Sequence, residues 1–249
     1  MPKFFVPEEQ IEKNEITIMG QDVKHIKNVL RKVIGDEIIV CNKTKEKDYL
    51  CEVMEIQKEF IKCNIIRELE ENVESKIEIT VFQGLPKFDK MELIIQKSVE
   101  LGVYKIVPVS MKRCVVKLQE KDKEKKQKRW NTISEVAAKQ CGRNRVPEIN
   151  TILNIKDINN LIEEYDVFLV AYENEKDITL KQCLKNIKEE YKNDNIKIGV
   201  LIGPEGGIAP EEVQELKDNG AVSMSLGKRI LRTETVALNV ISIIMYELE

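Results

Sequence analysis

"IKIGVLIGPEGGIAPEEVQELKDNGAVSMSLG", residues 196–227, decides the fold class of this 249-residue chain. It opens with a nearly continuous apolar strand over 196–203 and passes through a glycine-rich turn. A helix follows, with Pro210 at its first position and two acids in its first turn. The helix leads into a second apolar strand over 221–227. Buried strands that alternate with helices are typical of an α/β fold, in which helices cover both faces of a mostly parallel sheet.

The same alternation extends through the rest of the C-terminal part. The other expected strands are 76–85, 105–111 and 165–173, and the other expected helices are 89–102, 129–142, 180–191 and a closing apolar helix. Parallel strands end at one edge of their sheet, where α/β proteins bind ligands. We therefore expect the glycine loops after 203 and 227 to form the walls of one pocket. Backbone amides and leucine or isoleucine side chains there would suit an adenine ring.

The first 70 residues have a different pattern. Short strands rich in isoleucine, valine and aromatic residues are separated by charged turns, which predicts a small barrel-like module. One amphipathic helix interrupts them, with Gly35 closing it. Its expected apolar face is Ile26, Val29, Leu30, Val33 and Ile34. The acidic stretch 69–76 is the expected linker to the second domain.

Composition excludes several classes of enzyme. Six scattered cysteines and a single histidine, His25, cannot form an ordinary zinc site, and no other cluster suggests a metal. The same count excludes most Ser-His-Asp and Cys-His schemes unless His25 is the base. The N-terminal sequence does not read as a signal peptide, and the longest apolar run is too short for a membrane span. We expect a cytoplasmic protein with no membrane partner.

The charge is unevenly distributed. The net charge is −3, yet residues 112–145 contain about 12 basic against about 4 acidic residues. A basic segment on an acidic protein can bind polyphosphate, whereas a solvated lysine-rich helix is the alternative. Arg143, Asn144 and Arg145 end this segment and offer phosphate and base contacts, with a loop salt bridge as the alternative.

Polar residues also gather where the closing helix begins. Thr233 is the expected N-cap, and Glu234 is a favourable acid in the first turn. Capping and ligand binding are compatible at this position. Arg232 lies just outside the apolar helix, at the ligand edge of the sheet, which indicates an anionic partner.

Four stretches together resemble the SPOUT-class RNA methyltransferases, and in particular the branch that methylates uracil N3 in 16S ribosomal RNA. They are "HIKNVLRKVIGD" at 25–36, "EVAAKQCGRNRVPEI" at 135–149, "LIGPEGG" at 201–207 and "LGKRILRTETVA" at 226–237. The resemblance implies a PUA-like β-barrel that binds RNA over residues 1–72. It also implies a methyltransferase domain with a trefoil knot over 73–249, a homodimer and S-adenosylmethionine as cofactor.

The resemblance assigns roles to individual residues. The expected cofactor-binding residues are Ile202, Gly203, Pro204, Gly207, Leu226, Gly227, Ile230 and Leu231. The expected RNA-binding residues are His25, Arg31, Lys32, Arg113, Asn144 and Arg145, although a solvated helix face is the default for the first three. The resemblance makes the loop after 165–173 the third wall of the pocket, but this loop matches the family poorly, so Tyr172 and Glu173 receive no role.

Methylation of uracil N3 has its own chemical demands. The N3 lone pair is usable only when the imide proton leaves, so the enzyme must stabilise a developing anion and accept a proton. Arg143 and Arg232 are the candidates for stabilising charge, and Glu234 or Glu205 for accepting the proton. The alternatives are a SPOUT enzyme that methylates ribose 2′-hydroxyls of tRNA and a ribosome-assembly factor that binds RNA without catalysis.

Overall fold

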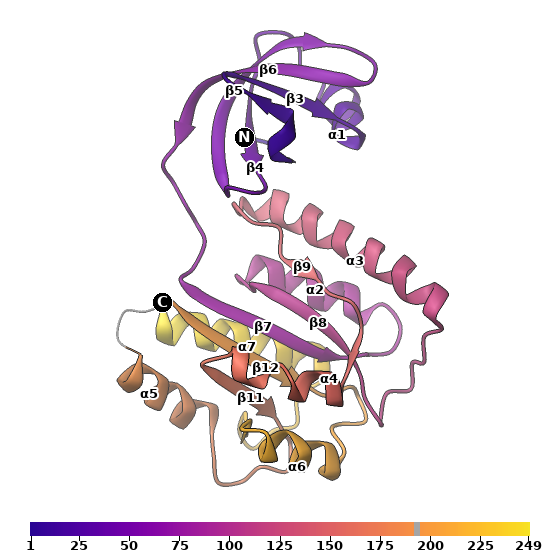
Figure 1. The fold of residues 1–249 in the computed structure, drawn as a ribbon, viewed down its shortest axis with the longest axis vertical. Helices are drawn as coiled ribbons and strands as arrows, with labels where there is room; N and C mark the ends of the chain where they lie inside the picture. The colour runs from indigo at the N-terminus through magenta and orange to yellow at the C-terminus, as the bar shows by residue number, and fades with distance from the viewer. Residues whose placement is uncertain (192–194) are drawn as a thin grey trace. The chain divides into compact units, whose positions relative to one another are not determined.

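The computed structural model describes residues 1–191 and 195–249, which form two compact units (Figure 1). The first unit contains residues 1–74 and 138–146, and the second contains 75–137 and 147–249. The chain therefore passes between the units three times. Helix α3, Glu120–Cys141, begins in the second unit and ends in the first.

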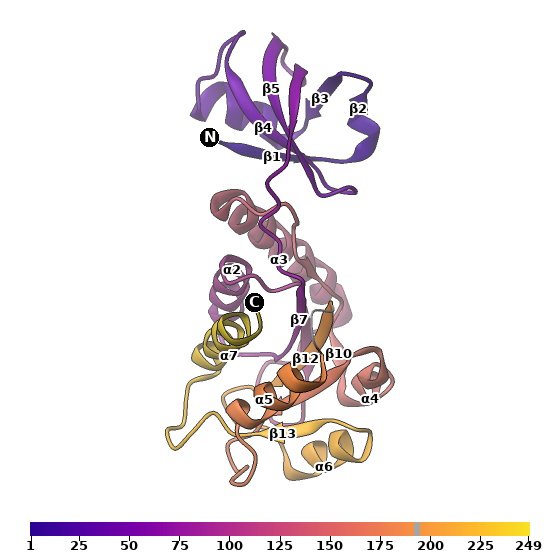
Figure 2. The same ribbon diagram turned by 90° about the vertical axis from the view of Figure 1, so that its left-hand side faces the viewer.

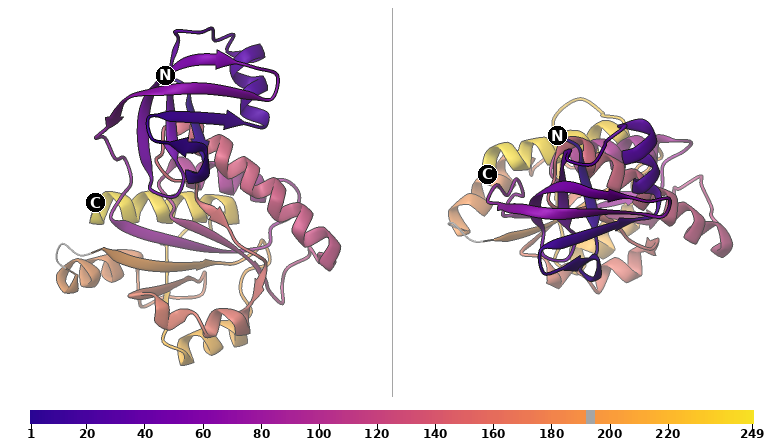
Figure 3. Two further views of the ribbon diagram at one scale, coloured as in Figure 1. Left: turned by 45° about the horizontal axis from the view of Figure 1, so that its top comes forward. Right: turned by 90° about the horizontal axis from the view of Figure 1, so that it is seen from above.

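The first unit is a curled six-stranded sheet around its own core (Figure 3). Its strand order is β1-β4-β5-β6-β3-β2, with β1 parallel to β4 and the other pairs antiparallel. Its strands are β1 (Lys3–Val6), β2 (Ile11–Glu12), β3 (Glu15–Met19), β4 (Glu37–Asn42), β5 (Lys47–Ile56) and β6 (Phe60–Leu69). Alternate residues of these strands point inward, and the core includes Phe4, Ile16, Ile38, Val53 and Ile61.

The helix expected in this unit is shorter than predicted. An α-helical turn, α1 (Gln21–Lys24), continues as one π-helical stretch over His25–Val29 and then ends. Arg31 adopts a left-handed conformation with φ 53°, which stops the helix. Val29, Val33 and Ile34 are consequently 67%, 61% and 64% exposed instead of forming the expected apolar face.

The second unit contains a parallel sheet with the order β10-β8-β7-β12-β11-β13. Its strands are β7 (Ile77–Gly84), β8 (Lys105–Ser110), β10 (Leu153–Asn154), β11 (Val167–Ala171), β12 (Ile196–Ile202) and β13 (Val222–Met224), and a short β9 (Glu148–Ile149) pairs with β8. The central strands are almost fully buried, as expected for a sheet covered on both faces.

Helices pack on both faces of this sheet. Helices α2 (Lys90–Glu100) and α7 (Thr233–Leu248) lie together on one face, and α4 (Ile155–Asn159) lies on the other (Figure 2). Helix α5 (Leu180–Glu190) contacts α7, and α6 (Pro210–Asp218) contacts α4. The α/β class, the curled N-terminal sheet and the parallel C-terminal sheet are confirmed, whereas the trefoil knot stays a prediction.

Two further features bear on the expected elements. Helix α3 begins at Glu120 instead of Arg129, so the lysine-rich run is itself helical. Within residues 1–191 and 195–249, no helix combines the length and apolar character that crossing a membrane requires.

Candidate active site

A cavity of about 570 Å³ lies at the carboxyl edge of the second unit's sheet. Its volume is typical of a small-molecule site. Three loops and two helices line it: the end of β11 with Tyr172 and Glu173, the segment Ile202–Gly207, the segment Ser225–Arg232, Lys90 of α2, and Thr233 and Val236 of α7. Every predicted cofactor-binding residue faces this cavity, so the two glycine loops form the walls of one pocket as the strand pattern predicted.

The first wall is a tight turn that requires glycine. The N–H of Gly207 donates to the carbonyl oxygen of Pro204 at 2.9 Å, which closes the turn. Gly207 has a φ of 71°, and a Cβ there would lie 2.2 Å from Oε1 of Glu173. The backbone therefore lies bare against the cavity, where a ligand can approach its amides and carbonyls.

The second wall is the irregular segment between β13 and α7. Gly227 again has a positive φ, 106°, and its N–H donates to Oγ of Ser225. Ile230 is 88% exposed, although Leu226 and Leu231 on the same segment are half-buried. Ile230 therefore offers an apolar side chain that a ligand in the cavity can contact.

The third wall is the loop after β11, in which the sequence assigned no role to Tyr172 and Glu173, and it is ordered by Glu175. Its carboxylate accepts the N–H groups of Lys176 and Asp177, both at 3.0 Å, and the hydroxyl of Ser223 on β13. These hydrogen bonds lower the pKa of Glu175 to about 2, and the bond from the Ser223 hydroxyl has the largest effect. The loop is thus fixed to the sheet, and it places Tyr172 and Glu173 at the cavity.

Thr233 does not cap the closing helix, contrary to expectation. Helix α7 begins at Thr233 itself, with Arg232 in the N-cap position. The Thr233 hydroxyl donates to the carbonyl oxygen of Gly203 at 2.7 Å and accepts Nε2 of Gln83 at 2.9 Å. The hydroxyl therefore joins the start of α7 to the ends of β7 and β12, and it does not cap its own helix.

A second group of polar residues lies beside this anchor. The Lys90 ammonium lies 3.0 Å from Oε1 of Glu205 and 3.3 Å from Oε2 of Glu234. The backbone N–H of Lys87 also donates to both Glu205 oxygens. The sequence did not predict a role for Lys90 at the cavity, because this residue lies in a pattern typical of the start of a helix.

Arg232 lines the cavity with its side chain exposed. Its guanidinium has no salt-bridge partner among the residues that the structure describes, and the same holds for the ammonium of Lys228 and the guanidinium of Arg229 nearby. The lining sets these three cations against the exposed carboxylate of Glu173, so this part of the cavity keeps a net positive charge, which favours an anionic ligand.

Two known domain families match this chain, and one of them includes the residues that line the cavity. Residues 73–245 match the RNA methyltransferase domain family, and residues 18–66 match the RNA methyltransferase PUA domain. The chain belongs to the RNA methyltransferase family. The cavity thus lies within the methyltransferase domain of this protein.

Individual relatives agree with this assignment. The methyltransferase is 36% identical to ribosomal RNA small subunit methyltransferase E of Bacillus subtilis, over 100% of this chain and 98% of the relative. The enzyme of the same name from Mesomycoplasma hyopneumoniae is 35% identical, over 96% of each chain. The crystal structure of ribosomal RNA small subunit methyltransferase E from Neisseria gonorrhoeae, bound to S-adenosylmethionine, superposes with a TM-score of 0.86. It is 30% identical and covers 100% of this chain and 98% of its own.

The methyltransferase places Arg143, Asn144 and Arg145 in its first unit, not in the unit that contains the cavity. Arg143 is 6% exposed, and its Nε and Nη2 both donate to the Glu74 carboxylate. The backbone N–H groups of Asn144 and Arg145 donate to the same carboxylate at 2.9 and 3.1 Å. The structure therefore contains the loop salt bridge that the sequence left open, and the catalytic and RNA-binding roles stay predictions.

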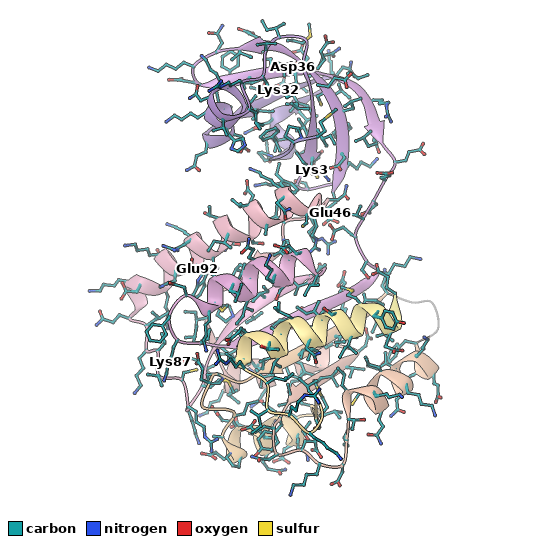
Figure 4. The ribbon with its side chains drawn as sticks, turned by 180° about the vertical axis from the view of Figure 1, so that it is seen from behind. Lys3, Lys32, Asp36, Glu46, Lys87 and Glu92 are labelled. Atoms are coloured by element: carbon teal, nitrogen blue, oxygen red, sulfur yellow. The ribbon has the colours of Figure 1, made fainter. Side chains whose placement is uncertain are left out.

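Further ion pairs tie this loop to the strands of the first unit. Arg145 donates from Nε and Nη2 to Glu46 at 2.6 and 2.9 Å (Figure 4). Lys3 of β1 forms a buried ion pair with Asp48 and donates to the carbonyl oxygen of Gly142 at 2.7 Å (Figure 4). The segment after α3 is thus part of the first unit's polar core.

The other expected RNA-binding residues of the first unit lie at its surface. His25 and Arg31 are exposed, and Lys32 is half-buried near Asp36, 3.9 Å away (Figure 4). His25 packs edge-on against Phe4, with ring centroids 6.1 Å apart. Both the solvated-face alternative and a role in RNA binding are compatible with this placement.

Arg113 belongs to the second unit and touches the glycine-rich turn. Its Nη1 donates to the carbonyl oxygen of Gly206 at 3.2 Å, and its own carbonyl oxygen would lie 3.1 Å from a Cβ at Gly206. The side chain remains exposed. Among the expected RNA-binding residues, Arg113 is the one that contacts a wall of the cavity.

Proposed function

We propose that this methyltransferase transfers the methyl group of S-adenosylmethionine to N3 of a uridine in 16S ribosomal RNA of the small ribosomal subunit. The observation that carries the proposal is the cavity at the carboxyl edge of the sheet, with its bare backbone turn and its cationic mouth. The names of the full-length relatives and the cofactor bound by the Neisseria enzyme support the choice of substrate and cofactor. Cytoplasmic ribosomal subunits are the proposed location of the substrate.

The residues of the cavity fit this cofactor. Backbone groups of Gly203, Pro204 and Gly207 supply neutral hydrogen-bonding partners, and Leu226 and Ile230 supply apolar contacts for the faces of an adenine ring. Ile202, Gly227 and Leu231 complete these walls. When bound, the cofactor supplies a methyl group that its positively charged sulfur makes electrophilic.

The chain's own residues have two tasks in the reaction. Arg232 stabilises the negative charge that develops on the uracil ring, because its guanidinium lines the cavity and has no salt-bridge partner in residues 1–191 and 195–249. Glu205 or Glu234 accepts the N3 proton. Arg143 is bound to Glu74 in the other unit, so of the two arginines the proposal gives the stabilising role to Arg232.

RNA binding uses both units in this proposal. The barrel of residues 1–72 contributes His25, Arg31 and Lys32, and the exposed lysines of α3 contribute charge that attracts phosphate. Because N3 lies on the Watson–Crick edge, the target base must be unpaired or flipped when it reacts. We also propose a homodimer as the working form.

The test uses small ribosomal subunits from cells that lack this protein. The subunits, naked 16S RNA and bulk tRNA are each incubated with the protein and S-adenosylmethionine, and N3 methylation is detected as a reverse-transcriptase stop. One new stop at a uridine of the subunit is the expected result. Methyl transfer to tRNA ribose without such a stop, or no transfer to any RNA, contradicts the proposal.

A further inference from the structure

Three charged residues from distant parts of the chain meet at the cavity, and we call them the Lys90 cluster. Lys90 is the first residue of α2, Glu205 lies in the glycine-rich turn, and Glu234 lies in the first turn of α7. Lys90 and Glu205 both face the cavity, with side chains 29% and 24% exposed. Glu234 is more buried, with its side chain 15% exposed.

Each member of the cluster has a fixed environment. Glu205 is held by the N–H of Lys87 at 3.1 and 3.2 Å as well as by Lys90. The Oε2 atom of Glu234 is buried 3.3 Å from the ammonium, with no hydrogen-bond donor among the residues that the structure describes. Glu234 therefore adds a second negative charge next to the ammonium of Lys90, which itself lines the cavity.

Lys90 and Glu205 are ionised at neutral pH. The hydrogen bond to Glu205, aided by Glu234, raises the pKa of Lys90. Burial alone would raise the pKa of Glu205, but its hydrogen bonds from Lys90 and the Lys87 N–H lower it below the usual range. The cavity wall thus presents a cation that only donates hydrogen bonds, beside an anion that only accepts them.

This arrangement is complementary to one base edge. Uracil presents the acceptor O4 next to the donor N3–H, whereas cytosine presents a donor amino group next to an acceptor N3. A lysine beside a carboxylate, 3.0 Å apart, matches the first pattern and opposes the second. A site built from buried or half-buried partners rejects a mismatched base strongly, because the mismatch leaves charged groups unpaired.

We infer that Lys90 and Glu205 bind the Watson–Crick edge of the target uracil, with Lys90 donating to O4 and Glu205 accepting the N3 proton. The inference rests on the proposed function and adds the residues that select uracil. As the N3–H bond breaks, the proton passes to Glu205 and the N3 electron pair forms the new bond to the methyl carbon. The carbon–sulfur bond breaks with its electron pair left on sulfur, and Lys90 stabilises the charge on O4. Glu205 then releases the proton to water.

The test compares Lys90→Met, Lys90→Arg and Glu205→Gln with wild type on small subunits. We expect Lys90→Met and Glu205→Gln to lower kcat by about 100- to 1,000-fold, the usual effect of removing one stabilising group from an active site. Lys90→Arg, which keeps a charged donor, should retain more activity. The dissociation constant for S-adenosylmethionine, measured by calorimetry, should stay within about twofold, because the two side chains bind the base.

A substrate analogue distinguishes a role of Lys90 and Glu205 in the chemical step from a purely structural role. RNA that carries 5-fluorouridine at the target has a more acidic N3–H, so less help is needed to remove the proton. Lys90→Met and Glu205→Gln should regain activity on this RNA relative to wild type, and their rate should rise with pH more steeply than that of wild type. Lys97→Met is the matched control, because Lys97 lies on the same helix and pairs only with Glu100 among the described residues.

The outcomes are distinct. Wild-type activity in Lys90→Met overturns the inference, and so does a loss of cofactor affinity without rescue by 5-fluorouridine, which would make Lys90 a cofactor-binding residue. If wild-type protein methylates no uridine in the subunit, the proposed function fails and the inference fails with it. Methylation of cytidine placed at the target position by wild type also contradicts the proposed base selection.

Phe88 supports a second inference, which a different observation carries and which also rests on the proposed function. It lies in the loop before α2, it is 87% exposed, and its φ of 56° is unfavourable for any residue with a side chain. A strained, exposed aromatic residue between Lys87 and Lys90 has the properties of a platform on which an unpaired base stacks. We infer that Phe88 stacks on a nucleotide of the bound RNA.

Phe88→Gly tests this inference because it should change the thermal stability of the protein and its affinity for RNA in opposite directions. Glycine relieves the backbone strain, so the midpoint of thermal unfolding should rise, while RNA affinity should fall about tenfold. Phe88→Trp should keep the affinity. Unchanged RNA affinity in Phe88→Gly overturns the inference, since the ring would then have no part in binding.

Discussion

The hydroxyl of Thr233 donates to the carbonyl oxygen of Gly203 at 2.7 Å, which joins the first residue of α7 to the end of β12. The same oxygen accepts Nε2 of Gln83, and Thr233 is buried. Two walls of the cavity are therefore held at a fixed separation by one side chain. This contact explains why a threonine at the start of an apolar helix matters for the cavity without capping the helix.

Thr233→Val should destabilise the protein by about 1–3 kcal/mol, because the Gly203 carbonyl and the Gln83 amide lose a buried partner. Affinity for S-adenosylmethionine should fall as the walls separate. Urea unfolding and calorimetry measure the two effects. Thr233→Ser keeps the hydroxyl and should behave like wild type, so equal behaviour of the valine and serine variants would contradict the bridging role.

Gly207→Ala should weaken cofactor binding more than it weakens the fold. Its left-handed backbone costs alanine about 1–2 kcal/mol, and the new Cβ would also displace the Glu173 carboxylate, which lies 2.2 Å from its position. Gly220→Ala is the matched control, with a φ of 98° and its closest neighbour, Ile162, 3.8 Å away. Both variants should lose similar stability, but only Gly207→Ala should raise the Kd for the cofactor.

The buried pair of Arg143 and Glu74 should dominate the stability of the first unit. Glu74→Ala leaves the Arg143 guanidinium buried without its main partner, which should cost about 3–5 kcal/mol in urea unfolding. Glu68→Ala removes the partner of Lys47 in a pair that is 49% and 47% exposed, and it should cost less than about 1 kcal/mol. A small effect at Glu74 would show that the loop is held by other contacts.

The same pair predicts a dependence on pH. Burial alone would raise the pKa of Glu74, but hydrogen bonds and charge from Arg143 lower it below its ordinary value of 4.5. A carboxylate with a lowered pKa stabilises the fold fully above 4.5, and that contribution is lost as pH falls below it. Stability of wild type should therefore decrease below pH 4.5, and Glu74→Ala should have a flatter profile there.

The sequence predicted the walls of the cavity because strand ends in a parallel sheet have a fixed geometry. A strand that ends at Gly203 and another that ends at Gly227 must finish at one edge, whatever contacts the rest of the chain makes. Lys90 and Glu173 were missed because no local pattern marks them. They reach the cavity only through the packing of α2 on α7 and through a loop ordered by Glu175.

At three positions the local sequence pattern did not predict the structure, because contacts distant in sequence, or a single backbone conformation, decided the outcome. Apolar spacing predicted a helix as far as Ile34, but Arg31 takes a left-handed conformation that no periodicity records. Threonine is a common N-cap residue, yet the Thr233 hydroxyl donates to the carbonyl oxygen of Gly203, which is distant in sequence. Arg143 looked free to bind an anion because its partner, Glu74, lies in the segment expected to be a linker.

Glu175→Gln should loosen the third wall of the cavity. The neutral amide would no longer accept the Lys176 and Asp177 N–H groups and the Ser223 hydroxyl with the strength of a carboxylate. We expect about a tenfold rise in the Kd for S-adenosylmethionine, the equivalent of one weakened charged hydrogen bond. Glu189→Gln, in an exposed pair with Lys185 at 3.8 Å, should leave the Kd unchanged.

The exposed lysines of α3 should set the salt dependence of RNA binding. Lys121, Lys125 and Lys128 are exposed, and replacing all three by glutamine removes three charges without altering the core. If each contacts a phosphate of single-stranded RNA, the slope of log K against log salt should decrease by about 2. Lys156, Lys181 and Lys217 are equally exposed on α4, α5 and α6, and their triple glutamine variant is the control for net charge. Equal slopes in the two triple variants would mean that α3 acts only through overall charge, and the lysine-rich run would then be a solvated helix face.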